Sequence, residues 1–429
     1  MNFVKSLTTL GPRYMALWVG QTVSQFGTYI AFLTLPFLVR DIQQATSGDF
    51  RTLDFALTYA LETAPALFAG LVAGVLLDRW HLRPVMIATD LLRASAFFYL
   101  AAGYGSFGIE TVFVVAFLVG SLTTLFDGAL YTMIPSLVGR RRLADANSFV
   151  SASQQANFAL GTLAAGVLTV ATGGPSLGLF INGVTFGISA ICLYWVGRVD
   201  THRVRTDDRA PFLTEAADGI REIWSEPRLR ITTIAAAVPN FVMGFVEAAI
   251  VVLFPIVIGA ADEGQIGILV SAMGVGGIIG ALLAPRVVRA LGLGRTLTVG
   301  MTITGFLLLA FMFSNYGPVA LALNVGWMFG VSLINVPLAT IRQNYAKEGM
   351  LGRVVSASRA IGWATLPIGA LVGGWLADTE HALIVVARTF PILLVLTALW
   401  LYTTVVWTDT FGPNFEGRHT KGRERAAEA

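Results

Sequence analysis

Long apolar stretches separated by short polar segments dominate this chain of 429 residues. An α-helix crosses a bilayer core with about 20 consecutive apolar residues. The stretches of this kind are 14–39, 54–77, 84–104, 111–135, 149–171, 176–197, 231–258, 265–285, 295–314, 317–340, 354–377 and 382–406. A membrane β-barrel would instead show segments of about 10 residues with alternating hydropathy. The pattern therefore predicts an all-α membrane protein with twelve transmembrane helices.

The composition supports a membrane protein and excludes several other classes. Only 13% of the residues are charged, 55% are hydrophobic, and the mean hydropathy is +0.70. A soluble domain carries about 25% charged residues, so a soluble enzyme, a disordered protein and a coiled coil are excluded. The net charge of +3 gives no reason to expect a nucleic-acid partner. The single cysteine, Cys192, excludes a disulfide bond within the chain.

The basic residues predict how the chain is oriented in the membrane. With the N-terminus inside, the cytoplasmic loops and both termini hold 24 of the 29 Lys and Arg residues, whereas the outer loops hold only Arg40 and Arg51. Cytoplasmic loops of membrane proteins are enriched in Lys and Arg. We therefore expect a multi-pass protein with both termini in the cytoplasm. The first stretch is too long for a cleaved signal peptide and has no small-residue cleavage site after it.

The longest polar segment between two spans, 198–230, divides the spans into six plus six. The expected domains are an N-terminal six-helix bundle (1–197), a cytoplasmic linker (198–230), a C-terminal six-helix bundle (231–407) and a cytoplasmic polar tail (408–429). Within the linker, Glu215–Trp224 has the pattern of an amphipathic helix. Ile220, Ile223 and Trp224 are predicted to lie on its membrane face.

Short repeated motifs indicate that the two halves are related. Val-Ser-Ala-Ser begins at Val150 in span five and again at Val355 in span eleven, 205 residues later. A Gly-x-x-x-Gly pair begins at Gly70 in span two and again at Gly276 in span eight, 206 residues later. Two nearly equal offsets on corresponding spans predict a duplicated six-helix unit, which is a recurring plan among transporters.

Four acidic residues lie inside predicted spans, where a charged side chain costs about 2.5–3.5 kcal/mol. Glu62, Asp127 and Glu247 have no basic residue nearby on the same helix. Each is a candidate for binding a proton or a cationic substrate; the alternative is a carboxyl group that bonds to a neighbouring helix. Asp90 differs because Arg93 follows it by three residues on the same helix face, which predicts an ion pair.

Other chemistry is absent from the sequence. None of the three lysines follows a glycine-rich phosphate-binding run, and the four histidines fall in loops or in the tail. No cluster of His, Cys and acidic residues has the spacing of a metal site. No nucleophile lies beside a base within a span. We therefore expect no cofactor, no metal and no enzymatic activity.

The segment from Gly74 to Arg83, Gly-Val-Leu-Leu-Asp-Arg-Trp-His-Leu-Arg, resembles the loop between spans two and three of the major facilitator superfamily. The family pattern is Gly-x-x-x-Asp-Arg-x-Gly-Arg-Arg, and His81 stands where a glycine is usual. The resemblance implies that this loop latches the inward face, with Asp78 pairing near the start of span eleven. The residues assigned to this cytoplasmic gate are Gly74, Asp78, Arg79, Arg83, Asp90, Arg93, Arg353 and Arg359.

A narrower resemblance covers most of the chain. Its motifs are Leu17-Trp18 with Gln21, Ser24 and Gly27, then Pro135–Val138, Leu253–Pro255 and Leu351–Val354. Together they are similar to the drug:proton antiporter branch that includes macrolide-efflux proteins and the enterobactin exporter. In that family spans one and seven face the central cavity, so Gln21 and Asn240 are candidates for lining the substrate path; hydrogen bonding between helices is the alternative. The Gly-Pro motif of many antiporters is missing from span five.

These observations predict a proton-coupled secondary transporter whose two pseudo-symmetric six-helix bundles alternate around a central site. The resemblance implies export of a lipophilic or cationic small molecule from a bacterial plasma (inner) membrane. The expected partners are that substrate, protons and the lipid bilayer, and we expect a monomer. Two alternatives stay open. One is a dedicated exporter or importer of a single metabolite such as a siderophore, and the other is a non-transporting sensor or scaffold.

Overall fold

The computed structural model describes residues 10–46, 51–66, 81–139, 142–197, 212–260, 262–347, 350–377 and 379–406, and helices make up nearly all of them. The helices are α2 (Pro12–Thr46), α3 (Thr52–Thr63), α5 (Leu82–Ala102), α6 (Ile109–Val138), α7 (Leu143–Thr172), α8 (Ser176–Val196), α9 (Phe212–Ser225), α10 (Pro227–Leu253) with η3 (Phe254–Ile258), α11 (Glu263–Leu291), α12 (Leu293–Phe311), α13 (Pro318–Tyr345), α14 (Leu351–Leu376) and α15 (Glu380–Leu401) with η4 (Tyr402–Val406). Within these ranges eleven helices are long and apolar enough to cross a membrane. The second predicted span begins in α3, and its later residues lie outside the described ranges.

Local signals in the sequence explain where the helices begin and end. A helix in lipid satisfies its own backbone hydrogen bonds, which is why apolar stretches of this length become helices. Asp262 begins α11 by accepting a hydrogen bond of 2.8 Å from the backbone N–H of Gln265. Pro227 occupies the first turn of α10, where its missing N–H leaves no bond unmade. Gly173 ends α7 with a φ of 70°, a conformation that favours glycine.

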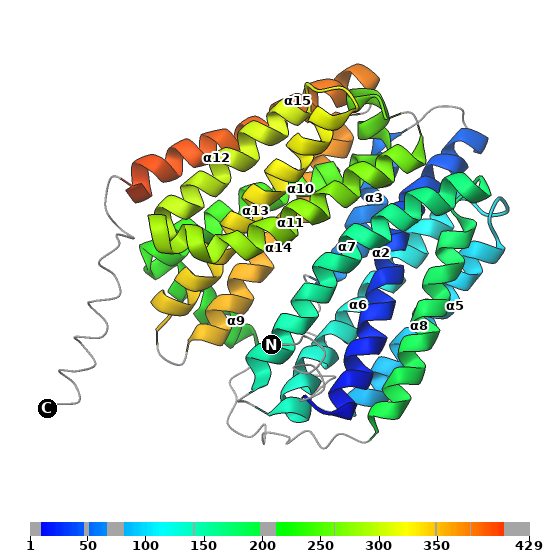
Figure 1. Ribbon diagram of the computed structural model, residues 1–429, viewed down its shortest axis with the longest axis horizontal. Coiled ribbons are helices and arrows are strands. Elements are labelled where there is room, and N and C mark those ends of the chain that lie inside the picture. Colours follow the sequence, from blue (N-terminus) through cyan, green and yellow to red (C-terminus); the bar gives the residue numbers. More distant parts are fainter. Residues whose placement is uncertain are drawn as a thin grey trace, which may run out of the picture.

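Two bundles of helices lie side by side in Figure 1. The N-terminal bundle contains α2, α3, α5, α6, α7 and α8, and the C-terminal bundle contains α10 to α15. Their packing repeats. α2 packs on α7 as α10 packs on α14, α5 packs on α8 as α12 packs on α15, and α3 packs on α6 as α11 packs on α13. The predicted fold, two pseudo-symmetric bundles from a duplicated unit, is confirmed.

The two bundles meet along α7 with α11 and along α3 with α14. Where α7 crosses α11, a Cβ atom added to Gly267 would lie 2.9 Å from the Cα atom of Gly166. A Cβ atom added to Gly274 would lie 2.7 Å from that of Ala159. Small residues let helix backbones approach this closely in a membrane. We call Ala159, Gly166, Gly267 and Gly274 the glycine seam.

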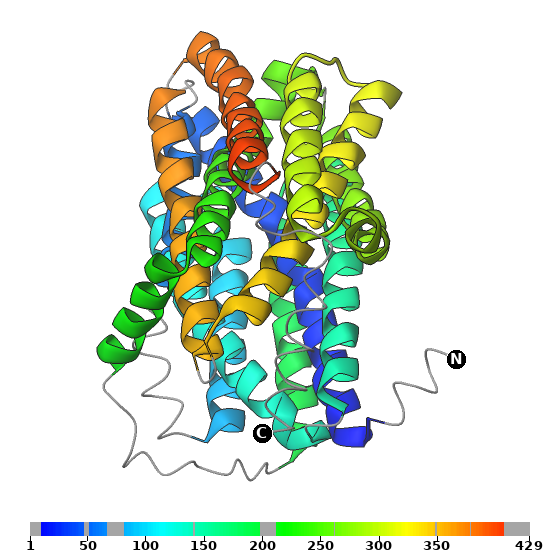
Figure 2. The same ribbon diagram turned by 90° about the vertical axis from the view of Figure 1, so that its left-hand side faces the viewer.

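The seam lies toward one end of the molecule, where α2 ends and α3 begins; we call this the α3 end. Two side-chain bonds between described residues also join the bundles there. The Arg40 guanidinium lies 2.7 Å from a carboxylate oxygen of Glu263, and the Thr52 hydroxyl donates a hydrogen bond of 2.8 Å to the carbonyl of Ala377. Figure 2 shows the long axes of both bundles from the side. The structure is therefore closed at the α3 end.

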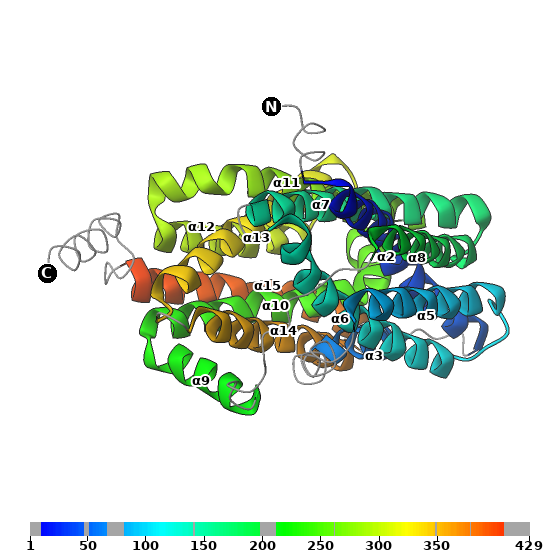
Figure 3. The ribbon, with the colours of Figure 1, turned by 90° about the horizontal axis from the view of Figure 1, so that it is seen from below.

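The amphipathic helix predicted at Glu215–Trp224 is present as α9, at the opposite end of the C-terminal bundle, and it packs on α10 and α14 (Figure 3). We call this the α9 end. The expected membrane face is wrong for one side chain. Ile223 is fully buried against Val354 and Ala357 of α14, whereas Ile220 and Trp224 are exposed. Ile223 is turned toward α14 because its apolar side chain completes a small cluster there, which periodicity alone does not distinguish from a membrane face.

Two ion pairs hold α9 in this position. The Arg353 guanidinium lies 3.1 Å from a carboxylate oxygen of Asp218, and the Lys347 ammonium lies 2.7 Å from one of Glu222. Both basic residues belong to the α13–α14 region of the C-terminal bundle. α9 is thus attached to the C-terminal bundle through charged as well as apolar contacts.

Large aromatic side chains lie exposed on the outside of the bundles. Trp195 is 77% exposed, Tyr194 72% and Trp375 69%, although such rings are normally buried in water-soluble proteins. Many exposed large apolar side chains are expected of a surface that faces lipid, and aromatic rings are enriched near membrane interfaces. The chain is a multi-pass membrane protein.

Candidate functional site

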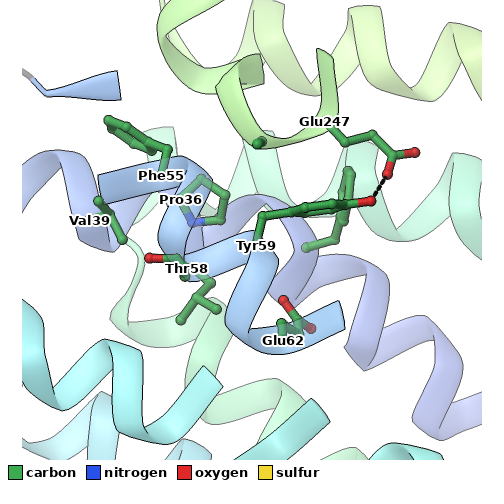
Figure 4. Close-up of a pocket in the computed structure, with 10 residues that line it drawn as sticks. Pro36, Val39, Phe55, Thr58, Tyr59, Glu62 and Glu247 are labelled. Carbon is green, nitrogen blue, oxygen red and sulfur yellow. Dashed lines mark hydrogen bonds between the residues drawn. The ribbon is translucent and has the colours of Figure 1, made fainter. Parts of the chain in front are cut away.

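The centre of the candidate site is a contact between the bundles that carries a carboxyl group. Glu247 extends from α10, and the hydroxyl of Tyr59 on α3 donates a hydrogen bond to its Oε2 atom, as Figure 4 shows. Glu62 lies one turn along α3 from Tyr59, close enough to Glu247 for the two carboxyl groups to interact electrostatically. A tyrosine and two acidic residues from both bundles thus meet at one place.

The surroundings of this carboxyl pair are mostly apolar. A cavity of about 20 Å³ separates the side chains, which is room for about one water molecule. It is lined by Phe32, Leu35, Pro36, Val39, Phe55, Thr58, Tyr59, Glu62, Glu247 and Ala248. None of these lining residues is basic. A carboxylate here has no counter-ion among the described residues, so the site favours capture of a proton or of another cation.

Asp127 lies on α6, away from the cavity of Glu247, and is exposed. It is close enough to interact with Arg93 of its own bundle and with Arg359 of the other bundle. Tyr29 on α2 interacts electrostatically with both Glu247 and Asp127. The two acidic positions are therefore separate sites, with Tyr29 between them.

The ion pair expected from the spacing of Asp90 and Arg93 is present and buried. Their charged groups lie 2.5 Å apart, and the Arg93 guanidinium also lies over the rings of Phe126 and Phe186 at 4.5 and 4.3 Å. Thr123 accepts a further hydrogen bond of 3.3 Å from Arg93. These contacts all lie within the N-terminal bundle. The assignment of this pair to the cytoplasmic gate stays a prediction.

The described gate residues have partners of their own. Arg83 donates hydrogen bonds of 3.0 and 2.7 Å to the carbonyls of Leu193 and Tyr194, at the C-terminal end of α8. The helix dipole stabilises a positive charge at this end. Arg353 pairs with Asp218 of α9. Gly74, Asp78 and Arg79 lie outside the described residues, so the predicted pairing of Asp78 with α14 stays a prediction.

The two candidates for the substrate path have different surroundings. Gln21 on α2 is buried, and its Oε1 atom has no hydrogen-bond partner among the described residues. Asn240 on α10 donates a hydrogen bond of 2.9 Å to the carbonyl of Gly362, as helix–helix bonding predicts. Asn240 also lines a second cavity, which lies between α10, α13 and α14 and contains Arg342 and Arg359.

Sequence reasoning missed Tyr59 and Arg342. Tyr59 precedes Glu62 by three residues, so the two share a helix face, and that spacing is the signal that could have drawn attention to it. Arg342 falls just after the predicted span 317–340, so the sequence predicts that it lies in a loop, but α13 continues past it to Tyr345. Its position in a cavity depends on where that helix ends.

Two helical bundles from a repeated unit, with polar groups where they meet, are the plan of many secondary transporters. The sequence model of the Major Facilitator Superfamily matches residues 17–363 of this chain. The chain therefore belongs to this family. The chain is similar to the multidrug efflux pump Tap of Mycolicibacterium fortuitum, with 28% identity over 408 residues that cover 90% of this chain and 94% of Tap.

Two solved structures share the fold. A bacterial homologue of the iron transporter ferroportin, in an inward-facing state, has a TM-score of 0.72 at 15% identity and covers 94% of this chain and 99% of its own. The nucleoside transporter NupG has a TM-score of 0.70 at 14% identity and covers 92% of this chain and 99% of its own. At these identities the likeness shows the fold alone. This chain is a transporter of the major facilitator family.

Proposed function

We propose that this transporter exports a lipophilic or cationic small molecule in exchange for protons, by alternating access. The observation that carries this proposal is the hydrogen bond from Tyr59 to Glu247. It places a carboxyl group, in a cavity that no basic residue lines, in the contact between the two bundles. A site that binds protons must change the contact between bundles if proton movement is to drive transport.

The hydrogen bond provides such a connection. A phenol donates more strongly to a carboxylate than to a neutral carboxyl group, because a charge-assisted hydrogen bond is about twice as strong. Gain or loss of a proton at Glu247 therefore alters how firmly α3 of one bundle holds α10 of the other. In the proposed cycle the substrate enters from the α9 end and displaces the proton. The protein then opens at the α3 end, where the substrate leaves and a proton returns.

The distribution of basic residues supports the direction of this cycle. Among the described residues, most of the Lys and Arg side chains lie toward the α9 end, so we assign this end to the cytoplasm, with both termini. The structure is closed at the α3 end, as expected of a state open to the cytoplasm. The same proposal includes a cytoplasmic linker (198–230), a cytoplasmic tail (408–429) and the cytoplasmic gate. It also includes a plasma-membrane location and a monomeric state. The efflux pump Tap supports export as the direction.

The proposal is tested by ethidium efflux from proteoliposomes under an imposed pH gradient. Glu247→Gln keeps the shape of the side chain but removes the proton site. We expect it to reduce gradient-driven efflux by at least about tenfold, since one protonation state of the cycle is lost. Glu380→Gln, an exposed acidic residue in the first turn of α15, is the matched control and should transport at the wild-type rate.

Two outcomes would contradict the proposal. One is wild-type efflux that continues at the same rate after a protonophore removes the gradient. The other is Glu247→Gln protein that retains gradient-driven efflux at the wild-type rate. Loss of ethidium transport in both the Glu247 variant and the Glu380 control would indicate damaged protein, so both samples are first compared by thermal unfolding.

A further inference from the structure

The second cavity, between α10, α13 and α14 of the C-terminal bundle, has a chemistry unlike that of the carboxyl pair. Its volume is about 150 Å³, comparable with an engineered cavity that holds benzene. Arg342 and Arg359 both line it, and none of its lining residues is acidic. The cavity thus combines space for a small group with two positive charges.

The two arginines are not neutralised by the protein around them. Neither forms an ion pair with a described residue, and they lie close enough to repel each other. The Nε atom of Arg342 is buried and has no hydrogen-bond partner among the described residues. Burial of such a donor costs about 1–3 kcal/mol unless something accepts its hydrogen bond.

Two of the uncharged polar side chains that line the cavity are already hydrogen-bonded. The Asn240 amide donates to the carbonyl of Gly362, and the Ser358 hydroxyl lies 3.2 Å from that of Thr233. The guanidinium of Arg359 lies 4.7 Å from the centre of the Trp363 ring, which holds the group in place without using its N–H donors. No described residue accepts a hydrogen bond from either guanidinium group, so the arginine N–H groups are available to a ligand.

The cavity faces the other bundle and not the lipid. Arg359 is close enough to interact with Asp127 and Tyr131, which both lie on α6 of the N-terminal bundle. Asp127 does not line the cavity and forms no ion pair with Arg359. A ligand in the space between the bundles can therefore approach the cavity from the side of Arg359.

We propose that Arg342 and Arg359 form a binding site for an anionic group, a carboxylate or phosphate attached to a small apolar body, in the C-terminal bundle. Guanidinium groups match carboxylate and phosphate oxygens in geometry and form charge-assisted hydrogen bonds with them. The volume of the cavity admits a group about the size of an aromatic ring. This site goes beyond the proposed function, because its occupation depends on neither the direction nor the energy source of transport.

Binding of benzoate to the purified full chain in phosphatidylcholine nanodiscs tests the site by titration calorimetry. Benzylammonium has the same ring with the opposite charge. We expect benzoate to bind and benzylammonium not to, and we expect Arg342→Gln and Arg359→Gln each to weaken benzoate binding by about tenfold or more. Arg342→Lys and Arg359→Lys keep the charge and should lose less affinity. Arg388→Gln is the matched control, because Arg388 also lies over an aromatic ring, that of Phe313, outside this cavity.

Equal binding of benzoate and benzylammonium, or equal losses in the Arg388 and Arg359 variants, would overturn the site. The same variants in phosphatidylglycerol nanodiscs distinguish two sources of the anion. Benzoate binding that weakens only in these discs shows an anionic lipid headgroup in the cavity; unchanged binding shows a site for a soluble organic anion. No proton gradient is used, so a failure of proton-coupled export would leave these results unaffected.

Discussion

Two carboxyl groups inside the helical bundles of this protein, those of Asp90 and Glu247, are stabilised in opposite ways. Asp90 pairs with Arg93, three residues further along the same helix, and the arginine also lies over two aromatic rings. Glu247 has no basic partner in its cavity and accepts a hydrogen bond from Tyr59, on a helix of the other bundle. The first carboxyl group is held within one rigid unit, whereas the second lies where two units meet.

The difference teaches which acidic residue suits transport. A carboxylate that is balanced by an arginine on its own helix keeps its charge and its partner when the bundles move. A carboxylate whose partner is a neutral hydroxyl on the other bundle has its hydrogen bond changed when the bundles move. Burial of an acidic residue is thus not enough to identify a coupling site. The site is identified by the residue that bonds to the carboxyl group and by the bundle to which that residue belongs.

The largest effect on stability is expected at the pair within one bundle. Asp90→Asn leaves the Arg93 charge buried without its counter-ion, which should reduce the free energy of unfolding by about 3–5 kcal/mol. Unfolding in mixed detergent micelles measures this loss. The double variant Asp90→Asn, Arg93→Leu removes the unpaired charge and should recover part of the stability. Equal stability of the single variant and the wild type would show that the pair contributes little to the fold.

A smaller effect, on transport and not on folding, is expected at the pair between bundles. Tyr59→Phe removes the hydroxyl that bonds to Glu247, an interaction of about 1–1.5 kcal/mol, which corresponds to about a fivefold to tenfold change in rate. Initial rates of ethidium efflux measure it. Thr63→Val, which removes a hydroxyl that bonds only within α3, is the control. An efflux rate that is unchanged by Tyr59→Phe would show that the phenol hydroxyl has no part in proton coupling.

The smallest effect is expected at the pair that is both charged and shared between bundles. The side chains of Arg40 and Glu263 are partly exposed, at 22% and 23%, and such ion pairs contribute less than about 1 kcal/mol. Glu263→Gln should therefore shift the population of the state closed at the α3 end by no more than about fivefold. Spin labels at Thr46 and Thr379 report the distance between bundles there. A complete opening of this end would contradict the small contribution.

Much of the fold could be predicted because lipid imposes a simple rule on the sequence. Every span must satisfy its backbone internally and must be apolar over a fixed length, so hydropathy alone locates the helices. The repeated motifs at Val150 and Val355 indicated the two-bundle plan, which the packing of corresponding helices confirms. The match to the Major Facilitator Superfamily confirms the family that the motifs resembled.

The candidate site could be predicted only in part. A charge inside an apolar stretch is visible in any sequence, and this pointed to Glu62, Asp127 and Glu247. Which helix lies opposite each of them depends on tilt and rotation, so Tyr59 as the partner of Glu247 could not be derived. The same reason explains Ile223, which packs on α14. Arg342 lies in a cavity because α13 continues beyond the end of the predicted span. The roles of Glu62, Asp127 and Glu247 in transport stay predictions.

The glycine seam has a practical consequence for structure determination. Because backbone meets backbone there, one methyl group at Gly267 would be only 2.9 Å from the Cα atom of Gly166, and neither helix has a flexible side chain to move aside. An alanine at this position acts as a wedge that separates the bundles at the α3 end without altering any charge. The Gly267→Ala protein would then be a sample of the conformation open at the α3 end, suitable for structure determination without a bound ligand or antibody.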